Sequence, residues 1–283
     1  MYRQKLCLAT KESFGVPLTE QVRLFAEAGF EGFFTGFSSG TELAPLRKAA
    51  DECSMLFQSV HAPFSGCRAL WNGEAEEIEH ILTELIECVH ACADAEVPLM
   101  VSHAFIGFGF SDKPTERGIE NYARVVREAE KYGIRVAFEN TEGEEFLAAV
   151  MNAFRDCPNV GFCWDTGHEM CYNYSKDMPA LYGDRLFGTH LNDNLGIRDY
   201  AGKIFWHDDL HLLPFDGIAD WQGIADRLDR CGFDGPQTFE LNNTSKPGRH
   251  DNDKYARMEL TDYLAAAYAR ACRVASLRKY QKA

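Results

Sequence analysis

Residues 130–138, EKYGIRVAF, decide the fold, because a glycine ends a helical pattern there and an apolar run of strand type follows at once. The same arrangement occurs in AEAGFEGFF at 26–34 and in DRCGFDGPQTF at 229–239. Each of these stretches indicates a loop that leads from a helix into a strand. Because they recur from one end of the chain to the other, they predict helices and strands that alternate throughout.

Short runs of β-branched and aromatic residues predict the strands. They cover residues 5–9, 32–35, 56–61, 99–103, 135–139, 160–165, 186–190 and 238–240. Helical patterns cover residues 18–28, 41–53, 74–95, 115–132, 144–154, 221–231 and 253–273, and the weakest of them lies near 176–182. Each parallel strand needs a crossover helix, so this order predicts an α/β protein, a (β/α)8 TIM barrel in a single domain over residues 1–283.

A doubly wound open sheet is the competing fold. The sequence has neither GxGxxG nor GxxxxGK[ST] after its first predicted strand, which disfavours a nucleotide-binding protein of that fold.

The composition is that of a folded globular protein, and the length is typical of an enzyme. The 283 residues carry 29 Lys and Arg against 43 Asp and Glu, a formal net charge of −14, and 46% of them are hydrophobic. No apolar run approaches the roughly 20 residues that span a bilayer, and MYRQKLCLATKES lacks a signal-peptide core, so we expect a cytoplasmic protein without membrane contact. The 10 cysteines form no CxxC pair and indicate reduced thiols. The acidic balance disfavours nucleic acid as a partner.

Side chains that bind metals occupy the last positions of the predicted strands. They are His61, His103, Glu139, Asp165, His190 and Glu240, and the following loops add His168, Asp209 and His211. Any one of them alone is more often a hydrogen-bonded or helix-capping residue. Strand ends of a barrel meet on the face where active sites form, however, and carboxylates gathered there repel one another unless a cation is present. The pattern therefore predicts a divalent metal ion, Mn²⁺ or Zn²⁺, with Co²⁺ or Fe²⁺ as alternatives.

Ordered motifs run along nearly the whole chain. They are HAPF at 61–64, AFENTEG at 137–143, WDTGH at 164–168, HLNDN at 190–194, DLHLLPFDGIADW at 209–221 and FEL at 239–241. Together they resemble the xylose isomerase-like TIM barrel superfamily, which includes sugar epimerases, sugar-phosphate isomerases, inosose dehydratases and endonuclease IV enzymes.

The resemblance to ketose 3-epimerases implies a metal site and a set of substrate contacts. It implies Glu139, Asp165, His190 and Glu240 as ligands of one catalytic metal, Glu139 and Glu240 as the acid/base pair, and His168 as a substrate contact. We expect His61, His103, Asp209 and His211 to contact substrate, water or a weaker second ion. The substrate-binding arginine of those epimerases falls at Gly196, so Arg198, the nearest arginine downstream, is expected to bind substrate instead.

The predicted function is a divalent-metal-dependent isomerase or epimerase. It would act on a small-molecule sugar or sugar phosphate by proton transfer, because a carboxylate removes the proton next to the carbonyl and a bound divalent ion stabilises the resulting enediolate.

Several alternatives stay open. An endonuclease IV-like phosphodiesterase is the main one, because the same nine positions resemble the three-zinc ligand set of that enzyme. An inosose dehydratase-like lyase and a non-catalytic binding barrel are the others. The cations of the predicted top loops are scattered and read as solvated charge, although one or two would suit a phosphate or carboxylate: Arg68, Lys113, Arg117, Arg198, Lys203, Lys246 and Arg249. The sugar, the number of metal ions and the formation of a homo-oligomer are not determined.

Overall fold

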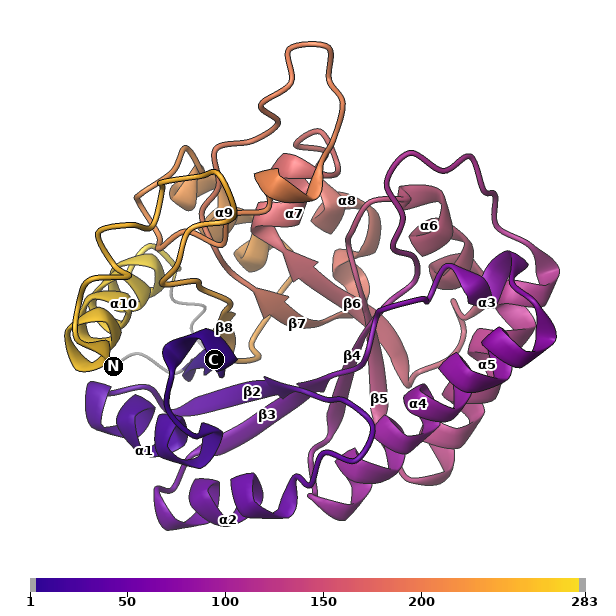
Figure 1. The fold of residues 1–283 in the computed structure, drawn as a ribbon, viewed down its shortest axis with the longest axis horizontal. Coiled ribbons are helices and arrows are strands. Elements are labelled where there is room, and N and C mark those ends of the chain that lie inside the picture. Colours follow the sequence, from indigo (N-terminus) through magenta and orange to yellow (C-terminus); the bar gives the residue numbers. More distant parts are fainter. Residues whose placement is uncertain (1–3, 280–283) are drawn as a thin grey trace.

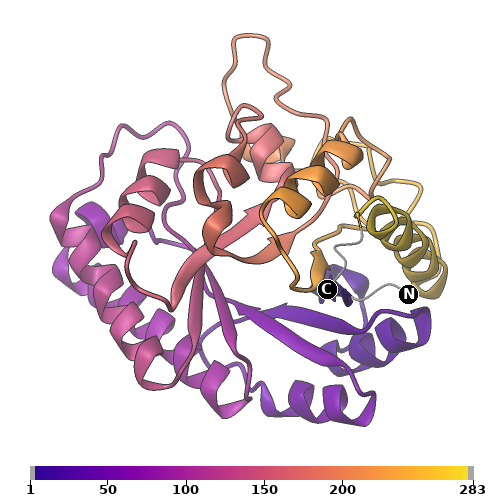
Figure 2. The same ribbon diagram turned by 180° about the vertical axis from the view of Figure 1, so that it is seen from behind.

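The computed structural model describes residues 4–279, in which eight parallel strands form a barrel inside a layer of helices (Figures 1 and 2). The strands are β1 Leu6–Ala9, β2 Gly32–Gly36, β3 Leu56–His61, β4 Leu99–His103, β5 Arg135–Glu139, β6 Val160–Asp165, β7 Leu186–His190 and β8 Gln237–Phe239. They pair in the order β7-β6-β5-β4-β3-β2-β1-β8. The last gap closes just beyond β7, where Leu191 N donates to Thr238 O at 2.8 Å. The predicted α/β TIM barrel is confirmed.

The helices follow the strands as crossovers. They are α1 Leu18–Ala28, α2 Ala44–Glu52, α3 Ala69–Asn72, α4 Ala75–Asp94, α5 Glu116–Lys131, α6 Glu144–Ala153, α7 Thr166–Cys171, α8 Met178–Tyr182, α9 Trp221–Arg230 and α10 Leu260–Ala275. Short 3-10 helices cover Glu12–Phe14, Gly183–Arg185 and Trp206–Asp208. Among residues 4–279, no helix has both the length and the apolar character that crossing a membrane requires.

The observed helices differ from the predicted ones in two respects. The helix predicted over residues 253–273 begins only at Leu260, because Ser245 Oγ accepts from Asn252 N at 2.9 Å and donates to Asp253 Oδ1 at 2.7 Å. These side-chain bonds hold the preceding segment in turns and compete with helical hydrogen bonds. Two short helices were also not predicted: α3, after β3, and α7, which begins directly after β6.

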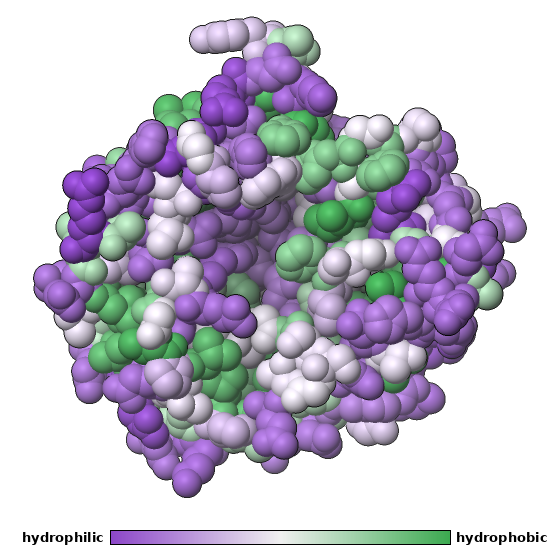
Figure 3. All heavy atoms as spheres, viewed as in Figure 1, coloured by the Kyte–Doolittle hydropathy of each residue, from purple (hydrophilic) through white to green (hydrophobic). Residues whose placement is uncertain are grey.

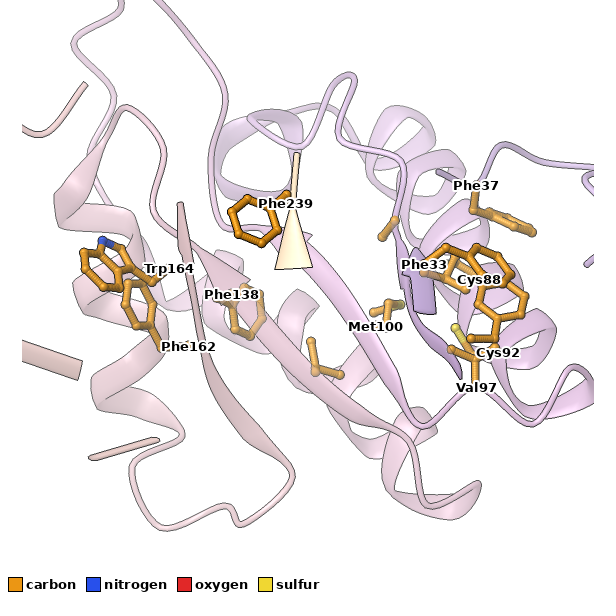
Figure 4. Packing of buried hydrophobic residues seen from close by; sticks show 14 of the residues in the cluster. Phe33, Phe37, Cys88, Cys92, Val97, Met100, Phe138, Phe162, Trp164 and Phe239 are labelled. Carbon is orange, nitrogen blue, oxygen red and sulfur yellow. The ribbon is translucent and has the colours of Figure 1, made fainter. Parts of the chain in front are cut away.

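Alternation along the strands decides which side chains reach the barrel interior. Cys163 and Ala137 form a small buried cluster with Leu99 and Val101 inside the barrel. Figure 4 shows Phe162 and Trp164 side by side on β6, in the main core that includes helix residues. Successive strand residues face opposite ways, so the residue two positions after each interior one faces the interior as well. This places His103, Glu139 and Asp165 above the apolar layer.

Helix α5 starts against a tryptophan of α3. Thr115 caps α5, because its Oγ1 accepts from Gly118 N at 3.1 Å, and it donates to Trp71 O at 2.8 Å. The indole of Trp71 is held in turn by Ala104 O, 2.7 Å from its Nε1. A Cβ on Gly118 would lie 2.0 Å from Trp71 Cε3, so only glycine fits at this contact.

Gly118→Ala is therefore expected to lower the free energy of unfolding by about 1–3 kcal/mol through overpacking. Chemical denaturation measures this change. Glu120→Ala, at an exposed position of the same helix, is the control and should stay within about 0.5 kcal/mol of the wild type. Equal stability of Gly118→Ala and the wild type would contradict the described contact.

Candidate active site

The predicted site residues gather at the carboxyl ends of the strands. Figure 3 shows a hollow near the middle of the face drawn in Figure 1, with hydrophilic residues on its floor. The strand register determines how far each side chain stands along the barrel axis. His103 pairs with Glu139, and Asp165 pairs with His190. Glu139 pairs with Cys163, so Asp165 stands two residues further along its strand than the partner of Glu139.

Glu139 lies at the centre of this group. Its side chain is fully buried, and Oε2 lies 3.2 Å from both His61 Nε2 and His103 Nε2. Oε1 lies 3.1 Å from His190 Nδ1 and 3.3 Å from His168 Nδ1. One carboxylate therefore contacts four imidazoles, which come from separate parts of the chain.

A second carboxylate shares one of these imidazoles. His190 Nδ1 lies 3.3 Å from Glu240 Oε2 as well as 3.1 Å from Glu139 Oε1. Glu139, Asp165, His190 and Glu240 each offer one ligand atom within 4.8 Å of the others. This spacing is suited to the coordination of one divalent ion by oxygen and imidazole nitrogen.

Two further groups of ligand atoms adjoin the first. His61 and His103 form one with Glu139, and their Nε2 atoms are 3.2 Å apart. His168, Asp209 and His211 form the other. In this second group the Asp209 carboxylate lies 3.5 Å from His168 Nε2 and 3.0 Å from His211 Nε2. The structure thus brings all nine predicted histidine and carboxylate positions into one continuous assembly.

Backbone carbonyls orient three of the imidazoles. Nδ1 lies 2.9 Å from Ala62 O in His61, 3.0 Å from Asn140 O in His168 and 3.1 Å from Glu240 O in His211. A carbonyl can only accept, so each Nδ1 carries the proton, and in the neutral ring Nε2 is left as an acceptor that can bind a cation. The fold therefore presents these rings in the tautomer that a metal site or a substrate hydroxyl requires.

Two asparagines hold Asp165 in place. Asn192 Nδ2 donates to Asp165 Oδ2 at 2.9 Å and to Oδ1 at 3.1 Å, while His168 N donates to Oδ1 at 2.7 Å. Asn140 holds the backbone of the same residue: Asp165 N donates to Asn140 Oδ1 at 2.8 Å, and Asn140 Nδ2 donates to Asp165 O at 2.9 Å. Both asparagines stand inside the motifs AFENTEG and HLNDN, but neither was among the predicted site residues.

Burial and neighbouring charges shift the pKa values of the central groups. Burial raises the pKa of Asp165 to about 6 and lowers the pKa of His103 to about 4. Burial alone would raise the pKa of Glu139, but charge on His190 and hydrogen bonds from the surrounding imidazoles hold it well below its usual range. Glu139 is therefore an anion at neutral pH and His103 is a neutral base, and these are the forms that bind cations.

One cysteine also reaches the group. Cys163 offers a sulfur atom within 4.8 Å of the ligand atoms of Glu139 and His190. Burial raises the pKa of this thiol to about 11, so it is protonated at neutral pH and a poor ligand. The donor set that fits a divalent ion is thus the predicted one of carboxylate oxygens and imidazole nitrogens.

The basic residues near the site differ from the expectations. Arg198 is 63% exposed, and its Nε lies 3.9 Å from Asp208 Oδ1, so the contacts do not join it to the assembly. Lys246 was interpreted as solvated charge, but its Nζ lies 3.4 Å from Asp209 Oδ2. Lys11 was not among the predicted site residues, but its Nζ lies 2.6 Å from Glu240 Oε1. Its position in LATK, directly after the first strand, was the available signal.

A family model described as a xylose isomerase-like TIM barrel matches residues 22–264. The match covers most of the chain, and the chain belongs to this family. An uncharacterized protein of Methanocaldococcus jannaschii is 26% identical over 205 residues, which are 65% of this chain and 64% of that protein. One of Sinorhizobium fredii is 37% identical over 82 residues, 29% of this chain and 23% of that protein. The matches therefore span less than two thirds of the length of either relative.

Solved structures share the fold at low sequence identity. A crystal structure of the IolI protein with a bound zinc atom has a TM-score of 0.73 at 17% identity and covers 98% of this chain and 100% of that chain. D-psicose 3-epimerase in the presence of D-fructose has a TM-score of 0.68 at 15% identity, over 95% and 99%. The 3-keto-D-glucoside 4-epimerase of E. coli has a TM-score of 0.64 at 16% identity, over 93% and 99%.

Asp193 holds the loop that carries Asp209 and His211. The side chain is fully buried, and its carboxylate accepts four N–H groups, from Asn194 N, Phe215 N, Ala219 N and Trp221 Nε1, at 2.8 to 2.9 Å. Its backbone also bonds Leu212 in both directions at 2.9 Å. The residue therefore fixes both sides of the loop after β7.

Asp193→Asn is expected to lower the free energy of unfolding by about 2–4 kcal/mol, because an amide group replaces an oxygen that accepts two N–H groups. Chemical denaturation tests this expectation. Asp199→Asn, at an exposed position of the same loop, is the matched control and should change stability little. A variant Asp193→Asn as stable as the control would show that the carboxylate does not hold the loop.

Proposed function

Because the chain belongs to the xylose isomerase-like TIM barrel family, we propose that it is a divalent-metal-dependent isomerase or epimerase of a sugar. The neighbours whose titles name epimerases of D-psicose and of 3-keto-D-glucoside support this class of reaction. The neighbour with a bound zinc atom supports a divalent ion.

The position of two glutamates carries the proposal. Glu139 Oε1 and Glu240 Oε2 lie 3.1 and 3.3 Å from the same atom, His190 Nδ1, although they come from the ends of β5 and β8. Two carboxylates close to one point can exchange protons with the same small molecule. Removal of a proton next to a carbonyl and its return elsewhere need two such groups.

The residues have separate roles in this reaction. Glu139, Asp165, His190 and Glu240 would hold the divalent ion, which supplies positive charge that stabilises an enediolate when it is bound. The Glu240 side chain is 15% exposed and Glu139 is fully buried, so Glu240 is the carboxylate that meets substrate from the open side. Glu139 completes the acid/base pair. His61, His103, His168, Asp209 and His211 would bind the hydroxyl groups.

Aromatic rings cover the imidazoles and shape the space above them. Phe34 stacks on His190 with ring centroids 4.5 Å apart, and Phe64 stacks on His103 at 4.8 Å. Phe64 is 47% exposed, so part of its surface remains available to the C–H groups of a sugar. The stacking fixes the ring planes, and an exposed aromatic surface beside polar ligands suits a carbohydrate.

Hydrogen exchange in D₂O tests the proposed reaction. The protein with bound Mn²⁺ should place deuterium on a carbon next to the carbonyl of at least one ketose or ketose phosphate, as followed by NMR. Glu240→Gln should slow this exchange by about 100-fold or more, because it removes a general base. The metal content of the variant is measured in parallel, so that loss of the base is separated from loss of the ion.

Glu79→Gln is the matched control, because Glu79 pairs with Arg124 on the exposed surface of α4, at 2.5 Å, and should leave exchange unchanged. Absence of exchange across free and phosphorylated ketoses, with the ion bound, would contradict the proposed function.

The three adjoining groups of ligand atoms favour a second candidate, a metal-dependent phosphodiesterase. Several divalent ions in this assembly would suit hydrolysis of a phosphodiester by a bridging hydroxide. About three bound ions per chain, with cleavage of abasic-site DNA that Asp209→Ala abolishes, would establish this alternative over the isomerase. One ion per chain and no cleavage would exclude it.

A further inference from the structure

Two lysines reach the candidate site from neighbouring strands. Lys11 follows β1, and Lys246 lies in the loop after β8, the strand that pairs with β1. The two loops approach each other at Ser13 and Asn243, whose side-chain oxygens are 3.5 Å apart. The loops that carry the two lysines are therefore neighbours at the carboxyl ends of β1 and β8.

Each of these lysines contacts a residue of the site. Lys11 Nζ lies 2.6 Å from Glu240 Oε1, and Lys246 Nζ lies 3.4 Å from Asp209 Oδ2. Both side chains are 21% exposed. Each ammonium group is thus largely shielded from water, yet it remains open to a molecule that enters the mouth.

Other cations near the mouth have carboxylate partners outside the site. Arg68 pairs with Asp112 at 2.9 Å, Lys113 with Glu145 at 3.3 Å, and Arg249 with Asp208 at 3.0 Å. Within residues 4–279, the carboxylates recorded for Lys11 and Lys246 are Glu240 and Asp209, which belong to the site. Among the lysines and arginines of residues 4–279, these two alone are recorded in contact with carboxylates of the site, so they would lose part of their charge compensation if those carboxylates bound a divalent ion.

The distribution of charge in the mouth then leaves a place for an anion on one side only. Glu139, Asp165, Glu240 and Asp209 with one divalent ion carry a formal charge of −2, which would repel an anionic substrate. The two ammonium groups bring this formal charge to zero and concentrate the positive charge on the β1 and β8 side. The loops after strands seven and eight are also where TIM barrels frequently bind phosphate.

We propose that Lys11 and Lys246 bind an anionic group, a phosphate or a carboxylate, at the end of a polyhydroxylated substrate. The inference rests on the proposed function and narrows its substrate class to anionic sugar derivatives. The reacting carbons would lie near Glu139 and Glu240, and the anion would replace the carboxylate contacts of the two lysines. Charge-assisted hydrogen bonds to each ammonium group would supply the affinity.

Calorimetric titration of the Mn²⁺-loaded protein with three probes of equal carbon number tests this proposal. The probes are erythritol, which is neutral, erythronate, which has a carboxylate, and erythritol 4-phosphate. At least one anion should bind about tenfold more tightly than erythritol, as a charge-assisted hydrogen bond allows. The anion that shows this advantage identifies the group as a phosphate or a carboxylate.

Variants distinguish anion binding by the two lysines from anion binding by the metal ion and from an effect of the overall protein charge. Lys11→Met and Lys246→Met should each lose most of the advantage, about tenfold, while binding of erythritol stays unchanged. Lys11→Arg should keep part of the affinity advantage of the anion, because arginine retains the positive charge. Lys203→Met, at an exposed position of the loop after β7, is the matched control and should keep all of it. The Mn²⁺ content of every variant is measured before titration.

Equal affinity for the three probes, or an anion preference that survives both Lys11→Met and Lys246→Met, would overturn the proposal. Anion preference without deuterium exchange on any ketose would support this subsite while contradicting the proposed reaction. Deuterium exchange on neutral ketoses without an anion preference would support the proposed reaction while contradicting this subsite.

Discussion

The contact of one buried carboxylate with four imidazoles is the constraint on which the site depends. Glu139 is removed from water, and a buried anion is costly unless partners compensate its charge. Among those partners, His61, His103 and His190 end β3, β4 and β7, and His168 follows β6, so the compensation requires most of the barrel to close in register. The site is therefore complete only when these strands stand in their observed register.

The strands determine the positions of these side chains, and surrounding hydrogen bonds determine their orientation. Alternation along β5 and β6 places Ala137 and Cys163 below Glu139 and Asp165 in the interior. Backbone carbonyls then select the tautomer of three histidines, and Asn192 holds Asp165 through both of its oxygens. Such outer contacts reduce the reorganisation needed when a cation binds, because the donor atoms already converge.

The sequence predicts the barrel and the strand-end ligands because strand periodicity and strand-end position are local signals. Glu240 shows this, since it follows β8 directly. Contacts between distant loops have no such signal: Lys11 meets Glu240 across 229 positions of sequence, and Asp193 meets Trp221 across 28. The start of α10 was missed because side-chain bonds of Ser245, rather than helix propensity, determine where the preceding turns end. Arg198 was chosen as the nearest arginine downstream of Gly196, and its role in substrate binding stays a prediction, because its side chain is 63% exposed and its recorded carboxylate contact is to Asp208.

The central claim is that Glu139, Asp165, His190 and Glu240 together bind a divalent ion. A crystal structure of the protein with Mn²⁺, measured with anomalous diffraction at the manganese edge, tests it most directly. The account predicts an anomalous peak among these four side chains, with ligand atoms on the order of 2 Å away. Full occupancy of Mn²⁺ at another place, with no peak between Glu139 and Glu240, would contradict it.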